Sequence, residues 1–87
     1  MPLVLVVEDD RSTRESLCVA LRDAGMEVIS AASGEEALSR LDLTPVDVVV
    51  SDIMMGTVGG LDLLSHVQEH HPDSAVILVT AFGTIES

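Results

Sequence analysis

Four short runs of apolar residues are spaced along the chain, with longer mixed segments between them. The runs cover 3–7, 26–31, 46–51 and 75–79, and few polar residues interrupt them. Such runs predict strands that are buried on both faces of a parallel sheet. The run 26–31 alternates in part, so we expect it to be exposed on one face or to lie at an edge.

The segment after the first run carries a helical pattern. Asp10 or Ser12 can cap its start, and Gly25 is a natural stop just past its end. Apolar and small residues recur along it in steps of four and three, which predicts the face that packs on the sheet. That face comprises Thr13, Leu17, Ala20, Leu21 and Ala24.

Two further helices are predicted between the later runs. Ser33 and Glu36 have the spacing of a capping box at the start of one, which ends before Pro45. The other ends at Pro72, and its apolar face comprises Leu61, Leu64 and Val67. Strands that alternate with helices predict βαβ units with right-handed crossovers, and hence a single α/β domain over residues 1–87.

The charge of the chain limits its partners. Fifteen acidic residues face four arginines and no lysine, which gives a formal charge of −11. Binding of nucleic acid phosphates depends on clustered lysine and arginine, so we expect no direct nucleic acid contact. The charge suits a cation site, a basic protein partner, or solubility alone.

Cysteine usage and hydropathy bear on the compartment. Cys18 is the only cysteine, so no internal disulfide can form, and its place in a helical pattern predicts a core thiol. The start of the chain lacks a signal-peptide pattern, and no apolar stretch approaches the roughly 18 residues that span a bilayer. We therefore expect a cytoplasmic protein without membrane contact.

Polar residues follow three of the apolar runs. Glu8, Asp9 and Asp10 follow the first, Asp52 the third and Thr80 the fourth. Carboxyl ends of parallel strands meet at one edge of the sheet, where ligands bind in open α/β folds. Clustered carboxylates favour a hard cation such as Mg²⁺, and an aspartate beside it can attack phosphorus to form an acyl phosphate. Solvated strand ends are the alternative, but the coincidence at three strands favours a phosphoryl-accepting site.

Together these residues resemble the receiver domain of bacterial two-component response regulators. The resembling stretches are Val6-Val7-Glu8-Asp9-Asp10 with Arg14, Asp52-Ile53-Met54-Met55 running to Gly60-Leu61-Asp62-Leu63-Leu64, and Val79-Thr80-Ala81. They extend over essentially the whole chain. The resemblance implies a flavodoxin-like fold, with helices on both faces of a parallel sheet that here has the strand order 2-1-3-4.

The resemblance also implies a role for each site residue. Asp52 would be the phosphoacceptor and Thr80 the switch hydroxyl. Asp9 would bind Mg²⁺, or Mn²⁺ in its place, directly, and Glu8 would act on the metal through water. Asp52 and the backbone carbonyl of Met54 would complete the metal site.

The chain departs from the family pattern at three places. Gly56 and Gly59 stand where the family usually has proline and aspartate, which predicts a looser loop after Asp52. Glu8 replaces the commoner aspartate. The sequence also stops where the fourth helix is expected, so we expect a C-terminally truncated receiver, without the fifth strand, the phosphate-pairing lysine and the last helices.

Three functions compete. The first is a phosphoacceptor module of a phosphorelay, which takes its phosphoryl group from a sensor histidine kinase and is not otherwise an enzyme; its output domain is absent from this sequence. The second is a structural or dimerising fragment, impaired in phosphorylation, that keeps only the acidic metal pocket. A phosphatase or nucleotide-binding domain is less favoured, because no glycine-rich phosphate loop follows the first strand.

Two other features concern binding and assembly. His66 and His70 lie one helical turn apart, with His71 next to them, but no third ligand type has suitable spacing, so we expect a solvated helix end and not a zinc site. The run 75–79 would be a sheet edge without lysine or proline to protect it. This predicts a homodimer through that strand or through exchange of 80–87.

Overall fold

The structure, a computed structural model, describes residues 1–79. Strands and helices alternate throughout. The strands are β1 (Leu3–Val7), β2 (Glu27–Ala31), β3 (Val48–Asp52) and β4 (Ala75–Val79), and the helices are α1 (Arg11–Asp23), α2 (Gly34–Leu43) and α3 (Gly60–His70). Every pair of neighbouring strands is parallel, and the order in the sheet is β2-β1-β3-β4. The predicted fold class and strand order are confirmed.

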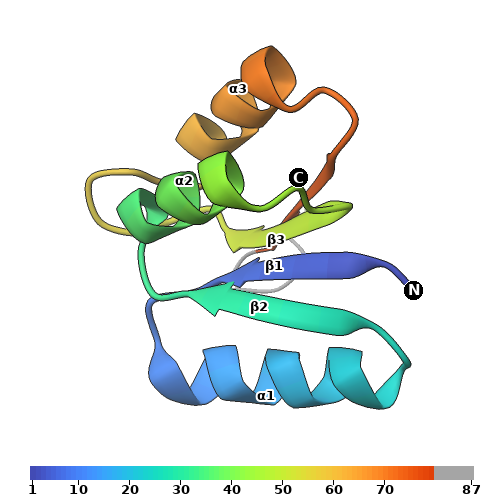
Figure 1. Cartoon of the computed structure of the whole chain (residues 1–87). Helices are drawn as coiled ribbons and strands as arrows, with labels where there is room; N and C mark the ends of the chain where they lie inside the picture. The colour runs from blue at the N-terminus through green and yellow to red at the C-terminus, as the bar shows by residue number, and fades with distance from the viewer. Residues whose placement is uncertain (80–87) are drawn as a thin grey trace, which may run out of the picture.

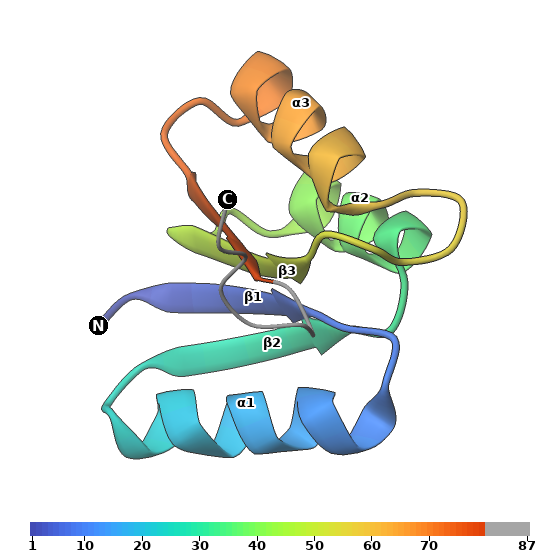
Figure 2. The same cartoon turned by 180° about the vertical axis from the view of Figure 1, so that it is seen from behind.

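The three helices cover the two faces of the sheet unequally. Figures 1 and 2 show α1 on one face, with α2 and α3 together on the other. Strand β1 supplies both layers of the core, since successive side chains of a strand point to opposite faces. Val4 and Val6 pack on the α1 side, and Leu5 and Val7 on the α2 and α3 side. None of the four is more than 2% exposed, as expected for a central strand.

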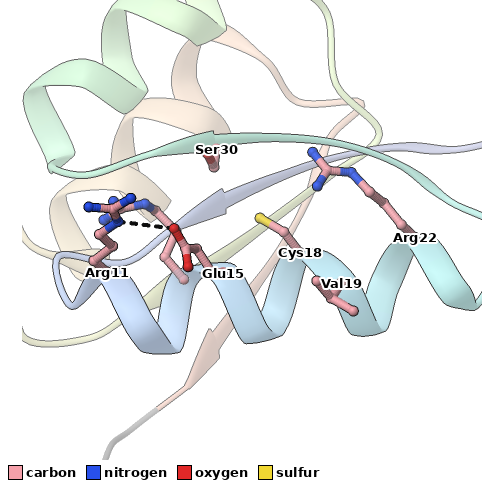
Figure 3. A pocket seen from close by; sticks show the side chains of 7 residues that line it. Arg11, Glu15, Cys18, Val19, Arg22 and Ser30 are labelled. Carbon is pink, nitrogen blue, oxygen red and sulfur yellow. Dashed lines mark hydrogen bonds and ion pairs between the residues drawn. The ribbon is translucent and has the colours of Figure 1, made fainter.

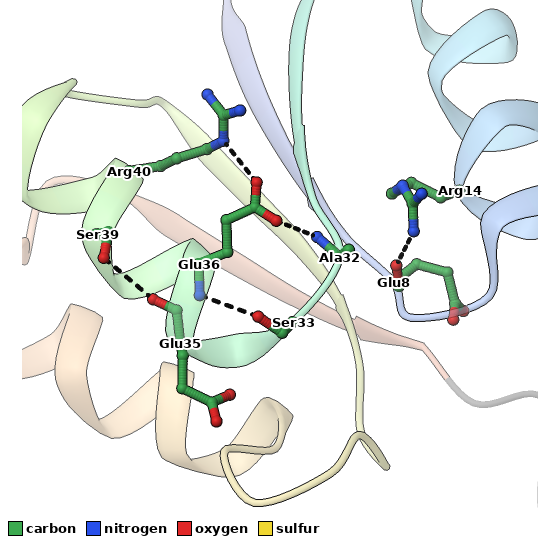
Figure 4. Close-up of polar contacts among 8 residues, drawn as sticks. All are labelled: Glu8, Arg14, Ala32, Ser33, Glu35, Glu36, Ser39 and Arg40. Atoms are coloured by element: carbon green, nitrogen blue, oxygen red, sulfur yellow. Dashed lines mark hydrogen bonds and ion pairs between the residues drawn. The ribbon is translucent and has the colours of Figure 1, made fainter.

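The predicted helix boundaries are confirmed by their caps. Asp10 caps α1 by accepting a hydrogen bond from the backbone N–H of Thr13 at 2.9 Å, and Gly25, just past its end, has φ +92°. Ser33 caps α2 by accepting from the N–H of Glu36 at 3.1 Å. The predicted capping box is only half formed, because the Glu36 carboxylate accepts from the N–H of Ala32, at 2.9 Å, and not from the N–H of Ser33 (Figure 4).

The predicted inner face of α1 is partly wrong. Cys18 is the only buried residue of this helix, and it packs with Val4, Val6 and Val28. Leu17 and Leu21 flank it, whereas the other predicted members, Thr13, Ala20 and Ala24, are exposed. The predicted and the observed inner faces share Leu17 and Leu21 and have the same helical period, so periodicity alone does not distinguish them. The prediction of Cys18 as a core thiol is confirmed.

The buried face of α3 differs from the predicted one, because the residues at the start of the helix that face the sheet each lie one position earlier in the sequence. Gly60, Leu63 and Val67 are buried, while Leu61 is 62% exposed and Leu64 only half-buried. The cause is the close approach of the helix start to β3, which only a residue without a side chain allows at Gly60. Residues three and seven positions beyond Gly60 then face the sheet.

Strand β4 differs from its prediction as a buried strand. None of its residues is buried, and Ile77 is 52% exposed. Among the described strands, β4 pairs only with β3, so it lies at an edge, as the strand order requires. Strand β2 lies at the other edge, as its partial alternation predicted.

Candidate functional site

Three carboxylates meet at the carboxyl ends of β1 and β3. The two strands are direct neighbours, with Val7 opposite Ser51, so Glu8 and Asp9 follow β1 beside Asp52, the last residue of β3. One carboxylate oxygen of each of the three acids lies within 4.8 Å of the others. The predicted convergence of these residues is therefore present in the folded chain.

The three acids differ in burial and in their hydrogen bonds. The Glu8 and Asp52 residues are 6% and 9% exposed, whereas Asp9 is exposed. Oε2 of Glu8 accepts a bond from the N–H of Asp10 at 2.8 Å. Oδ1 of Asp52 accepts one from the N–H of Met54 at 3.1 Å, which places the Met54 backbone against this carboxylate. Asp9 is thus the acid most open to a ligand.

No arginine neutralises this cluster among the described residues. Arg14, the nearest candidate, donates from Nη1 to the backbone carbonyl of Glu8 at 2.9 Å and not to a carboxylate (Figure 4). Burial raises the pKa of Glu8, and the neighbouring acids Asp9 and Asp52 raise it further. The hydrogen bond from the N–H of Asp10 lowers this pKa, but the net shift is upward. The site is electronegative and suits a cation.

An open pocket adjoins the acids. It is lined by Glu8, Asp9, Asp10, Thr13, Leu17, Asp52 and Val79. The hydroxyl and the N–H of Thr13 both donate hydrogen bonds to Asp10, and these bonds lower the pKa of Asp10. Asp10 therefore caps α1 and is not a member of the carboxylate cluster. Thr80, the predicted switch hydroxyl, follows Val79 and lies outside the described residues.

A second pocket lies along α1 beside β2 (Figure 3). Three arginines line it, but each is engaged by a neighbour. Arg11 pairs with Glu15 at 3.0 Å, Arg22 donates to the carbonyl of Val28 at 3.2 Å, and Arg14 holds the Glu8 carbonyl. This pocket adds nothing to the carboxylate chemistry.

The histidine prediction needs correction. The structure brings His66 and His71 to one acid, Asp42, in the last turn of α2. Oδ1 of Asp42 lies 3.6 Å from Nε2 of His66 and 3.5 Å from Nε2 of His71. The third ligand type thought to be missing is therefore present, although His70, the predicted helical partner, lies outside the group.

The loop after β3 carries the departures at Gly56 and Gly59. Gly56 has φ +30°, which proline cannot adopt because its ring holds φ near −65°. The N–H of Gly59 donates to Oδ2 of Asp62 at 3.0 Å, which anchors the start of α3. This loop therefore follows a path that proline at position 56 would not permit. Met55 within it is a core residue, 5% exposed, while Met54 is 74% exposed.

Comparison with known proteins identifies the family. The family model described as "Response regulator receiver domain" matches residues 4–87. The chain belongs to this family. It is therefore a receiver domain of two-component signalling, and a phosphoacceptor role accords with the family, while the alternative of a fragment with only a metal pocket is not favoured.

Curated relatives are much longer proteins than this receiver. It is 37% identical over 82 residues to the transcriptional regulatory protein GlrR of Escherichia coli K12, and 39% identical over 84 residues to the C4-dicarboxylate transport transcriptional regulatory protein DctD of Rhizobium meliloti. These alignments cover 94% and 97% of this chain. The chain spans only 18% of either relative, so their full activities do not transfer to it.

Solved receiver structures match the fold closely. Response regulator protein TrrA of Thermotoga maritima in complex with Mg²⁺–BeF is 36% identical, with a TM-score of 0.88 over 93% of this chain and 70% of that one. A structure of histidine kinase ThkA in complex with TrrA matches at 34% identity and a TM-score of 0.89, over 100% and 75% of the two chains. These likenesses support the flavodoxin-like assignment. Among residues 1–79, none of the helices has the length and apolar character that a bilayer crossing needs.

Proposed function

We propose that this receiver accepts a phosphoryl group on Asp52, with Mg²⁺ held beside it. The observation that carries the proposal is the convergence of Glu8, Asp9 and Asp52 within 4.8 Å at the ends of two paired strands. Family membership makes a phosphoacceptor role the natural use of an aspartate in this place.

The bonding of Asp52 favours one of its oxygens as the nucleophile. Oδ1 is held by the N–H of Met54, whereas no described residue donates a hydrogen bond to Oδ2. A bond from Oδ2 to phosphorus would form as the bond from phosphorus to the donor breaks, with the electron pair leaving on the donor. The product is an acyl phosphate. The N–H of Met54 keeps the carboxylate oriented during this exchange.

The donor set fits Mg²⁺, with Mn²⁺ as a substitute. All candidate ligands are oxygens, and Mg²⁺ binds through one or two carboxylates while it keeps several waters. Exposed Asp9 suits direct coordination, and Glu8, buried with one oxygen bonded to Asp10, suits a role through water. The Met54 carbonyl would be a further ligand. Once bound, the cation would offset negative charge on the phosphoryl oxygens.

The roles proposed for Thr80 and for the phosphoryl donor also follow from family membership. Thr80 would hydrogen-bond a phosphoryl oxygen, since it comes directly after Val79, which lines the acid pocket. A sensor histidine kinase would be the donor, a partner that the ThkA–TrrA complex shows for a related regulator. We expect this domain to act in the cytoplasm, without enzymatic activity of its own beyond phosphoryl transfer.

A second copy of the chain is the proposed partner of β4. Support comes from the unpaired side of this strand among the described residues, from exposed Ile77, and from the lack of lysine or proline in 75–79. Antiparallel pairing of two β4 edges would give a closed twofold dimer. The other predicted route, exchange of 80–87, involves residues outside the described part of the chain.

Phosphorylation by a small acyl-phosphate donor tests the proposed role of Asp52. Wild type, Asp52→Asn and the control Asp23→Asn would be incubated with the donor and Mg²⁺, and intact mass would count phosphoryl groups. Asp23 is an exposed acid at the end of α1, away from the site. We expect one acid-stable, base-labile group on wild type and control, and none on Asp52→Asn. Equal labelling of Asp52→Asn would overturn the assignment.

A further inference from the structure

A second cluster of ligand groups lies near the amino ends of the strands, whereas the acid pocket lies at their carboxyl ends. Helix α2 ends at Leu43 before β3 begins at Val48, and α3 ends at His70 before β4 begins at Ala75. Both helix C-termini therefore lie at the amino ends of the strands. Asp42 comes from the last turn of α2, His66 from α3, and His71 caps the C-terminus of α3.

The two histidines of this cluster present unsatisfied nitrogens. Nε2 of His66 and Nε2 of His71 are sealed from solvent, and neither has a hydrogen-bond partner among the described residues. A buried polar atom without a partner costs free energy, so such a pair calls for an explanation. Both atoms face Oδ1 of Asp42, at 3.6 and 3.5 Å.

These separations are too long for hydrogen bonds but suit a shared metal ion. An N–H···O bond spans about 2.7–3.2 Å. Ligand atoms bound about 2.0–2.1 Å from a tetrahedral zinc ion lie about 3.4 Å from each other. The spacing of His66 and His71, with four residues between them, also falls in the range of zinc-binding histidine pairs.

The local charge favours a cation. A helix C-terminus carries about half a negative charge, and two such ends meet here. Asp42 adds a full negative charge in the last turn of α2, where an acid is otherwise unfavourable. Asp42 is 64% exposed in its side chain, so a metal could enter from that side and keep water as its fourth ligand.

We propose that Asp42, His66 and His71 form a metal site for zinc or a similar borderline divalent cation, separate from the magnesium site. Imidazole nitrogens favour this class of metal, whereas Mg²⁺ prefers the all-oxygen ligands of the carboxylate cluster at the carboxyl ends of the strands. A bound ion ties the end of α2 to the end of α3. It stabilises the folded chain by an amount that grows with the logarithm of the zinc concentration relative to the dissociation constant, because the unfolded chain does not hold the three ligands together.

Zinc titration of the whole chain tests the site. The chain is first stripped of metal and then saturated with Mg²⁺, so that the carboxylate site is filled before zinc is added. We expect one zinc ion per chain, and at least a tenfold loss of affinity in His66→Gln, His71→Gln and Asp42→Asn. His70→Gln is the matched control, since this exposed histidine lies beside His66, with ring centroids 4.6 Å apart, but outside the group. It should bind zinc like wild type, and so should Asp52→Asn.

Three results would overturn the site: no stoichiometric zinc binding by wild type, equal losses in His70→Gln, or loss in Asp52→Asn. The last would place the zinc in the magnesium pocket. Because a substitution at His66 or His71 can unfold the chain, X-ray absorption on the zinc-loaded native chain counts ligands without mutation. Two imidazoles are expected, and a coordination shell with one or none contradicts the proposal.

Discussion

A Cβ atom on Gly60 would stand 2.6 Å from the backbone carbonyl oxygen of Asp52. The first residue of α3 is thus pressed against the last residue of β3, the proposed phosphoacceptor. Carbon atoms do not approach backbone oxygens this closely, so any side chain at Gly60 must move the helix or the strand. The packing of α3 and the position of the site carboxylate are therefore mechanically linked.

Gly60→Ala should destabilise the protein. The displaced backbone should lower the free energy of unfolding by about 1–3 kcal/mol, the usual range for overpacking. Urea unfolding would measure it, with Ser65→Ala, an exposed position of the same helix, as control. Phosphoryl uptake on Asp52 should slow as well. An unchanged unfolding midpoint would show that α3 shifts freely and that Asp52 is not held by this contact.

Removal of either Asp9 or Asp52 should weaken magnesium binding sharply. Asp9→Ala and Asp52→Ala each delete one of the three converging carboxylates, and we expect at least a tenfold loss of Mg²⁺ or Mn²⁺ affinity. Calorimetric titration provides the measurement, and Asp23→Asn again controls for a lost surface charge. Equal affinity in wild type and both variants would remove the proposed metal site.

The sequence predicted the acidic site because its geometry is simple. Glu8, Asp9 and Asp52 directly follow or end apolar runs, and the strand order that the family resemblance implies makes β1 and β3 neighbours, which brings their carboxyl ends together. The role of each residue came from the family resemblance and stays a proposal. The position of Thr80 lies outside the described residues.

Tertiary packing decided what the sequence pattern left open. Leu61–Leu64 and Leu63–Val67 are both acceptable helical spacings, and the close contact at Gly60 selects the second. Asp42 is 24 positions before His66 and precedes a strand, so no local spacing connects them. Only the packing of α2 beside α3 on one face of the sheet makes them neighbours.

Glu8 should make the metal-free protein less stable as pH rises. Burial raises its pKa in the folded state above the ordinary value of 4.5, so between these two values the folded chain keeps a proton that the unfolded chain has lost. Stability is therefore highest on the acidic side of this window and falls across it as pH increases. Above the raised pKa the charged carboxylate stays buried at its full cost.

Glu8→Gln provides the test in the presence of a chelator. The variant should lose the part of the pH dependence that comes from Glu8 and should be more stable than wild type at neutral pH. Its magnesium affinity should nevertheless fall, since a neutral amide replaces an acid of the site. Parallel pH profiles of unfolding for wild type and variant would contradict the assignment of this dependence to Glu8.

Strand β4 should bring two copies together. Ile77 is 52% exposed on a strand whose outer side is unpaired among residues 1–79, so we expect sedimentation to show a dimer at micromolar concentrations. Ile77→Lys should place charges against each other across the twofold axis and yield monomers of lower solubility, or aggregates. Val19→Lys is the matched control, because Val19 is 56% exposed on α1, away from β4, and should leave the dimer intact. A stable, soluble wild-type monomer would mean that something other than a second copy protects this edge.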